Sequence, residues 1–113
     1  MAYKVVIQPQ AESNIAEAFS HIAVYSPRSA QRWFIQVKNA IQSLDEMPKR
    51  CPIAPEARDL DFELRHLLHR HFPSVYRIVF RIFEEAGEVH ILAVRHGARE
   101  PFSEEEMKPF LKL

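Results

Sequence analysis

The sequence predicts an α+β fold in which a helix hairpin packs on one face of a small, mostly antiparallel sheet. Two stretches, residues 11–25 and 30–44, repeat apolar side chains every three or four positions, which is typical of amphipathic helices. Short β-rich runs precede and follow the helices, at residues 3–8, 63–68, 75–82 and 89–97. The predicted order is therefore β-α-α-β-β-β, followed by a short C-terminal helix.

Proline and serine mark where the two long helices begin. Pro9 suits a first helical turn, where a missing N–H costs nothing. Ser26 followed by Pro27 is typical of an N-cap and the first residue of a helix. Because only a turn separates the two helices, we expect an antiparallel pair. The second helix should end before Pro48, and the proline-rich residues 47–61 should form a connecting loop.

The run of residues 74–83 alternates as a half-buried strand does. Arg77 and Arg81 point to one side of it, and four apolar side chains point to the other: Tyr76, Ile78, Phe80 and Ile82. Residues 84–87 end in glycine and predict a hairpin turn. Residues 89–94 are apolar on both faces, which predicts a central strand that is covered on both sides.

The C-terminal helix is predicted from a capping box. Ser103 stands three residues before Glu106, the spacing at which the two residues cap each other's backbone N–H groups. Pro109 limits the length of this helix. With the helix hairpin on one face of the sheet, we expect the other face to be partly open and to carry the arginines.

Composition narrows the class of protein. The 113 residues suit one domain, 1–113, and 47% apolar residues are ample for one core. A formal net charge of zero argues against a protein that coats nucleic acid by bulk electrostatics. The single cysteine, Cys51, excludes an intrachain disulfide, fits a cytoplasmic protein and is expected to be structural. We expect neither a signal peptide nor a membrane partner.

Basic residues gather in the strand region. From Arg65 to Arg81 the sequence holds four arginines, three histidines and no acid. Such a face suits binding of a polyanion, stabilisation of a charged transition state, or pairing with an acidic partner. The simpler interpretation is an exposed sheet face on which Arg77 and Arg81 pair with acids of the same region, namely Glu63, Glu84 or Glu88.

Other residues of interest also have simple interpretations. His90, inside an apolar strand, is expected to be a hydrogen-bonded core residue. Trp33 and Phe34 are expected to belong to the core rather than to stack on bases. Three histidines have no carboxylate or cysteine nearby in the sequence, so neither a metal nor another cofactor is expected: His66, His69 and His71.

Three segments occur in a specific order: Tyr-Arg-Ile at residues 76–78, a run at 89–97 that ends in His-Gly, and Ala-Arg-Glu at 98–100. With the strand and helix hairpin before them, they resemble the RelE/ParE superfamily. These are toxins of bacterial type II toxin–antitoxin modules and include plasmid stabilisation proteins. The resemblance implies a compact toxin that a cognate antitoxin wraps, in a heterotetramer or a larger assembly.

The resemblance also implies a candidate catalytic site. Arg77 and Arg99 match arginines of the RelE-like members, which cleave mRNA in the ribosomal A site, and Arg65 matches a lysine position more loosely. Arginine suits the phosphate because its planar fork matches phosphate oxygens. A proton carrier is needed as well, and His96 is the candidate, with His66 as the alternative.

Two departures from the RelE pattern leave the activity open. Glu63 stands at a lysine position, and the C-terminal tyrosine of some RelE members has no counterpart near Phe102. We therefore weigh three functions, and favour the first. The first is a toxin that cleaves mRNA on the ribosome. The second is a ParE-like, non-catalytic inhibitor of DNA gyrase that uses the arginines and residues 100–113 as binding surface. The third is a degenerate member that is not toxic.

Overall fold

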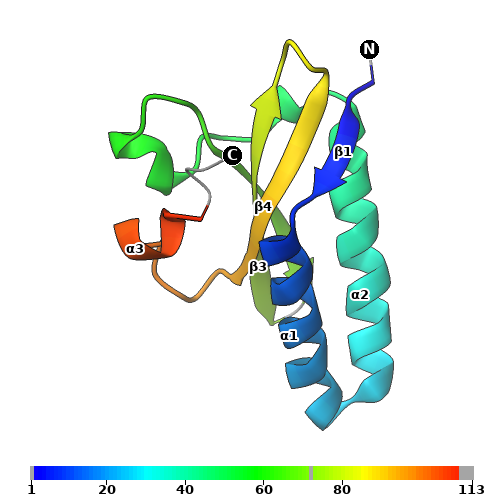
Figure 1. Cartoon of the computed structure of the whole chain (residues 1–113). Helices are drawn as coiled ribbons and strands as arrows, with labels where there is room; N and C mark the ends of the chain where they lie inside the picture. The colour runs from blue at the N-terminus through cyan, green and yellow to red at the C-terminus, as the bar shows by residue number, and fades with distance from the viewer. Residues whose placement is uncertain (1, 72, 110–113) are drawn as a thin grey trace.

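A computed structural model describes residues 2–71 and 73–109 of the chain. A four-stranded sheet with the order β1-β4-β3-β2 lies at its centre (Figure 1). The strands are β1 (Lys4–Ile7), β2 (Arg65–His71), β3 (Ser74–Phe83) and β4 (Glu88–His96). The β1 strand runs parallel to β4, and the other two pairs are antiparallel, so the mostly antiparallel sheet that we predicted is confirmed.

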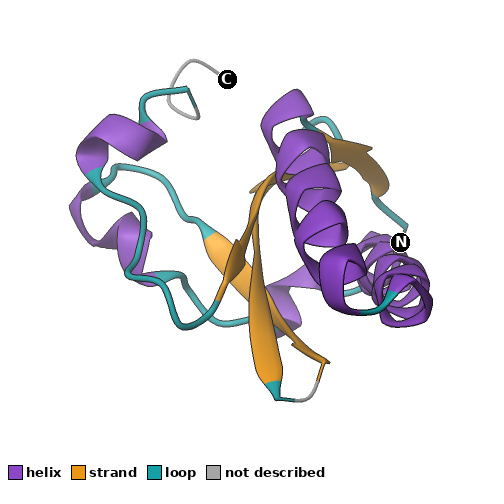
Figure 2. Ribbon diagram, turned by 90° about the horizontal axis from the view of Figure 1, so that it is seen from below, coloured by secondary structure: helices purple, strands orange, loops and turns teal. Residues whose placement is uncertain are grey.

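Two long helices form the predicted hairpin on one face of this sheet (Figure 2). They are α1 (Pro9–Tyr25) and α2 (Pro27–Gln42), and a proline begins each of them. Between them stands only Ser26, whose hydroxyl oxygen accepts the N–H of Ser29 at 3.1 Å. This N-cap was expected from the sequence, and it fixes where α2 begins.

The proline-rich connection between α2 and β2 forms 3₁₀ turns where only a loop was predicted. These turns are η1 (Ser43–Asp45), η2 (Pro48–Arg50) and η3 (Pro55–Asp59). Proline opens η2 and η3, because its fixed φ suits a first helical position. Through these short turns the chain crosses to the second face of the sheet, and η3 lies on that face (Figure 2).

The main core lies between the helix hairpin and the sheet. It joins Ile15 of α1 to residues of α2 and β3, namely Trp33, Val37, Ile41, Tyr76, Ile78 and Phe80. Trp33 is fully buried, as predicted, but Phe34 is 39% exposed, so its assignment to the core is wrong. Consecutive residues of a helix point about 100° apart, and only one of these two aromatic rings can face the sheet.

The second face of the sheet is covered rather than open. Val79, Leu92 and Ala93 form a second apolar cluster there with Ala54 and with Met107 of the short helix α3 (Glu104–Met107). The prediction that β4 is covered on both sides is thus confirmed, and so is the capping box that begins α3. We expected this face to be partly open and to carry the arginines. That expectation is wrong at the centre of the face, because apolar residues of β4 are buried there.

Residues 2–71 and 73–109 contain no helix that is both long and apolar enough to cross a bilayer.

Candidate functional site

Arg77 lies on the covered face of the sheet and is only 6% exposed. Its Nη1 and Nη2 donate to the two carboxylate oxygens of Glu56, at 2.9 and 2.6 Å. Its Nε donates to Nδ1 of His66 at 3.0 Å. The sequence suggested exposed partners for Arg77, but the partner is the buried Glu56 of η3. Each of the three guanidinium nitrogens therefore donates a hydrogen bond within the protein.

Glu56 ties two distant segments to this arginine. Its Oε2 accepts the backbone N–H of Phe102 at 2.9 Å, in addition to the bond from Arg77. Burial of the Glu56 carboxyl raises its pKa, but the bonds from Arg77 and Phe102 outweigh burial and leave this pKa below its usual value. Burial, and then the charge of Arg77, lower the pKa of His66, so its ring stays neutral and accepts.

The lowered pKa of Glu56 predicts a specific acid sensitivity. A carboxyl with a depressed folded-state pKa contributes stability that is complete above its unfolded value, 4.5, and is lost as the pH falls through the folded-state value. Wild type should therefore be more stable than Glu56→Gln near neutral pH, and this difference should shrink below about pH 4.5. Urea unfolding of both proteins from about pH 7 to about pH 3 measures it. A difference that stays constant over this range contradicts the prediction.

A second buried arginine lies beside the first. Arg95 is the Cα partner of Arg77 across the β3–β4 ladder. Its Nη1 lies 3.2 Å from Oε2 of Glu106, and its guanidinium carbon lies 4.1 Å from the centre of the Phe102 ring. The segment from residue 101 to α3 is therefore held on this face by charge and by apolar contact.

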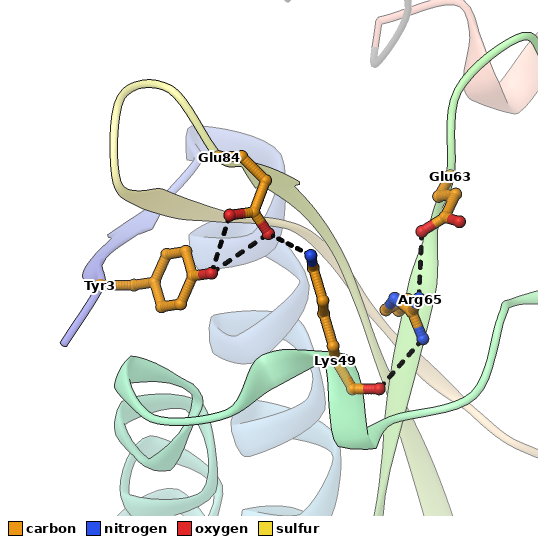
Figure 3. A network of polar contacts seen from close by, with 5 residues as sticks. All are labelled: Tyr3, Lys49, Glu63, Arg65 and Glu84. Atoms are coloured by element: carbon orange, nitrogen blue, oxygen red, sulfur yellow. Dashed lines mark hydrogen bonds and ion pairs between the residues drawn. The ribbon is translucent and has the colours of Figure 1, made fainter. Parts of the chain in front are cut away.

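Arg65 lies on the opposite face of the sheet. It pairs in register with Phe80, which belongs to the helix-side core, and direct cross-strand partners share a face. Its Nη1 donates to the carbonyl oxygen of Cys51 at 2.6 Å. The same atom donates to the carbonyl oxygen of Lys49 at 3.2 Å, and Nη2 donates to Glu63 at 3.0 Å (Figure 3). Arg65 thus anchors the proline-rich connection and does not meet the Arg77 guanidinium.

A neighbouring surface network joins three further elements (Figure 3). The Tyr3 hydroxyl donates to both carboxylate oxygens of Glu84, at 3.1 and 3.0 Å, and Nζ of Lys49 lies 2.8 Å from the same carboxylate. The bond from Lys49, and then the bond from Tyr3, lower the pKa of Glu84. The network is exposed, so water screens it, and we assign it to holding β1 beside the β3–β4 turn.

His96 and Arg99 line one cavity of about 360 Å³. One wall is a stripe of α1 at helical spacing, with Asn14, Glu17, Ala18 and His21. The other wall comes from the ends of β3 and β4 and the turn after them, with Tyr76, Val94, Arg95, His96 and Arg99. Of the four predicted site residues, the structure brings these two together and leaves Arg77 and Arg65 elsewhere.

The turn after β4 fixes how His96 is presented. Its Nδ1 accepts the backbone N–H of Ala98 at 3.0 Å, so the neutral ring carries its proton on Nε2. Its ring meets the Tyr76 ring edge-on, with 5.1 Å between centroids. The Gly97 N–H donates to the Val75 carbonyl at 2.6 Å, and a Cβ at this glycine would lie 2.9 Å from that oxygen. A larger residue at position 97 therefore has to displace the turn.

Sequence reasoning missed three residues of these sites. Glu17 and His21 sit four positions apart on α1, beside its apolar stripe, and this spacing was the signal that could have paired them. Glu56 gave no signal, because its partners are 21 and 46 positions away. In the part of the chain that the structure describes, no three His, Cys, Asp or Glu side chains gather as metal ligands.

The fold and the site define a small α+β domain, with a helix hairpin on one face of a four-stranded sheet and a cavity where the hairpin meets the strand ends. Residues 5–101 match the family described as "ParE toxin of type II toxin-antitoxin system, parDE". The chain therefore belongs to the ParE toxin family and is the toxin component of a type II toxin–antitoxin system.

Two toxins are similar to this chain along most of their length. Toxin RelE2 of Caulobacter vibrioides is 32% identical over 96 residues, which cover 85% of this chain and 97% of that protein. Toxin ParE2 of Mycobacterium tuberculosis is 33% identical over 102 residues, which cover 89% and 88%. One relative thus carries the RelE name and the other the ParE name.

Solved structures show the same fold. A chain of the chromosomal ParDE system of P. aeruginosa superposes with a TM-score of 0.66 at 14% identity, covering 84% of this chain and 96% of that one. A chain of the toxin–antitoxin complex RelBE2 of Mycobacterium tuberculosis gives 0.53 at 25% identity, covering 85% and 99%. The α+β architecture expected from the sequence is therefore the architecture of this superfamily.

Proposed function

We propose that this toxin arrests growth by binding DNA gyrase in the cytoplasm, without cleaving RNA. The state of Arg77 is the observation that supports the proposal. An arginine that balances the charge of a phosphorane needs free N–H groups aimed at the phosphate. Three N–H groups of Arg77, one from each guanidinium nitrogen, are aimed at Glu56 and His66, and the side chain is buried. The family description, which names ParE, points the same way.

The binding surface in this proposal includes part of the C-terminal segment. Of residues 100–113, the described part ends at Pro109, and Phe110–Leu113 lie outside the described residues. The charged side chains Glu100, Glu104 and Lys108 are exposed, whereas Met107 is buried against the sheet. This segment thus offers a polar surface that its own apolar residues hold in place.

A cognate antitoxin is the second part of the proposal. The structural neighbour RelBE2 from Mycobacterium tuberculosis was solved as a toxin–antitoxin complex. In this chain β2 presents a basic edge on which Arg70 is exposed and Leu68 is 47% exposed. An acidic segment with apolar residues complements this edge and would associate quickly. We propose an antitoxin of that chemistry, which binds the toxin in a heterotetramer or a larger assembly. In this proposal, mRNA on the ribosome is not a target.

RNA cleavage at His96 and Arg99 is the second candidate function, and the cavity favours it. Transesterification through the 2′-hydroxyl needs a proton carrier and a cation beside the phosphate. His96 presents its Nε2–H, and Arg99 lines the same cavity, as do Tyr76 and His21. The site residues for this candidate are therefore His96 and Arg99, without Arg77 and Arg65.

One pair of assays separates these functions. Purified protein in molar excess should block supercoiling of relaxed plasmid by gyrase and leave plasmid relaxation by topoisomerase I unchanged, which controls for DNA coating. Primer extension on mRNA from induced cells should show no new ends. Codon-positioned cuts with intact supercoiling would establish the second candidate instead. Induction without growth arrest would instead support the third function, that of a degenerate member that is not toxic.

A further inference from the structure

The outer side of the helix hairpin carries an apolar groove. This hairpin groove has a volume of about 520 Å³ and is lined from both helices, by Ala16, Phe19, Ser20, Gln31, Phe34 and Ile35. The rings of Phe19 and Phe34 meet edge-on between the helices, with 5.9 Å between centroids. Ile35 is 60% exposed, and Val24, one turn of α1 beyond Ser20, is 78% exposed. Large apolar side chains gathered on one exposed helix face are typical of a surface that binds a partner.

The two ends of the hairpin groove carry opposite charges. Glu12 stands one turn before Ala16 on α1, and Arg28 stands one turn before Gln31 on α2. Because the two helices are antiparallel, Glu12 and Arg28 lie at opposite ends of the groove and at similar distances from its centre. Both side chains are exposed. The Glu12 end also carries Lys38, whose Nζ lies 3.5 Å from Oε1 of Glu12.

Opposite charges at the two ends suit an interface between identical copies, because a two-fold interface requires a face that complements itself. With two hairpins antiparallel across the axis, the Glu12 end of each copy faces the Arg28 end of the other. A parallel arrangement would instead bring the two Arg28 ends together. Within residues 2–71 and 73–109, Arg28 takes part in no ion pair. The Glu12 carboxylate can accept hydrogen bonds from a second cation as well as from Lys38, since it has two oxygens.

We propose that the hairpin groove binds the hairpin of a second copy of this chain. Phe34 and Ile35 lie at the centre of this antiparallel dimer, and Glu12 of each copy pairs with Arg28 of the other at its two ends.

The size of the hairpin face sets the expected affinity. The 17 residues of α1 span about 25 Å, and two packed helices are about 20 Å across, so roughly 500 Å² of each copy is covered. Interfaces of this size are weak, and the dimer should form at micromolar concentrations. Neither gyrase nor RNA takes part in this contact. The β2 strand does not line the groove, so two antitoxins can join the dimer to make a heterotetramer.

Sedimentation velocity of the full-length protein over a series of concentrations tests the dimer. Wild type should change from monomer to dimer between about 5 and about 500 μM. Ile35→Glu places a charge at the centre of the contact and should raise the dissociation constant about a hundredfold or more. Leu68→Glu is the matched control, because Leu68 is 47% exposed on β2 and does not line the groove. This variant should dimerise as wild type does.

Charge reversal tests how the two copies are arranged. Glu12→Arg and Arg28→Glu each turn the ion pairs at both ends of the dimer into repulsive contacts, because the two-fold axis repeats every contact. Each single variant should raise the dissociation constant about tenfold. The double variant Glu12→Arg/Arg28→Glu exchanges the charges and should regain most of the wild-type affinity. Arg70→Glu, at an exposed arginine of β2, is the matched control and should leave the affinity unchanged.

Wild type that stays monomeric throughout the series overturns the dimer, whether or not the protein blocks gyrase. A monomer whose antitoxin binding is lost in Ile35→Glu would assign the groove to the antitoxin instead. Loss of the dimer in Leu68→Glu but not in Ile35→Glu also overturns the proposal, since the copies would then meet at β2. A double variant that dimerises as poorly as the single variants overturns the pairing of Glu12 with Arg28. Dimerisation regained by the exchanged charges supports both the surface and the antiparallel arrangement.

Discussion

Replacing Glu56 with alanine should lower the free energy of unfolding by about 3–5 kcal/mol, because it leaves the charge of Arg77 buried and unpaired. Arg77 is 6% exposed and gives two of its N–H groups to Glu56. The same change frees the Phe102 N–H that Glu56 accepts, which should loosen the segment before α3. Urea unfolding at neutral pH measures the loss. Glu63→Ala is the matched control, because its ion pair with Arg65 is exposed and should matter little.

The double variant Glu56→Leu/Arg77→Met shows what the ion pair is for. A buried pair replaced by apolar side chains of similar size is often neutral for stability, whereas removal of one partner is costly. We expect the double variant to regain most of the stability that Glu56→Ala loses, and to arrest growth as wild type does. A stable double variant that no longer arrests growth would assign Arg77 to the activity and count against our proposal.

Replacing Trp33 with alanine should cost about 3–5 kcal/mol of unfolding free energy, the range for large aromatic residues truncated in a core. Trp33 is fully buried, and its ring lies 5.1 Å from the ring of Tyr76, which in turn lies 5.1 Å from His96. The cavity left by the indole therefore lies one ring away from the candidate site. We also expect the ring signal of His96 to broaden or move in any variant that still folds.

Phe34→Ala is the control for this prediction, because Phe34 is the next residue along α2 and is 39% exposed. It loses an edge contact with Phe19 and little buried surface, so it should cost clearly less than Trp33→Ala. Chemical denaturation of both variants compares them directly. Equal losses would mean that the hairpin packs through both of these faces of α2.

Local patterns predicted the elements of this fold well. The helices, the cap at Ser26, the capping box at Ser103 and the alternation of β3 depend on residues within four positions of each other. For the same reason His96 and Arg99, three positions apart on one turn, line the same cavity. The local sequence was therefore sufficient to predict these features.

Features that depend on register or on distant segments did not follow from the sequence. Arg65 and Arg77 looked like one basic face, but the pairing of Arg65 with Phe80 puts them on opposite faces of the sheet. Glu56 comes to Arg77 only because η3 crosses the second face. A strand pattern shows that side chains alternate, but it does not show how neighbouring strands align.

The parallel pairing of β1 with β4 sets when a newly made chain can finish folding. Lys4 is the partner of Glu88, which stands 84 positions further along the chain. The β1 strand, which leaves the ribosome first, must therefore wait for β4, the last strand of the sheet. Its pairing edge has no partner strand during most of translation. Contacts this far apart close large loops and form slowly. A nascent chain, or one that ends before β4, therefore lacks the completed sheet.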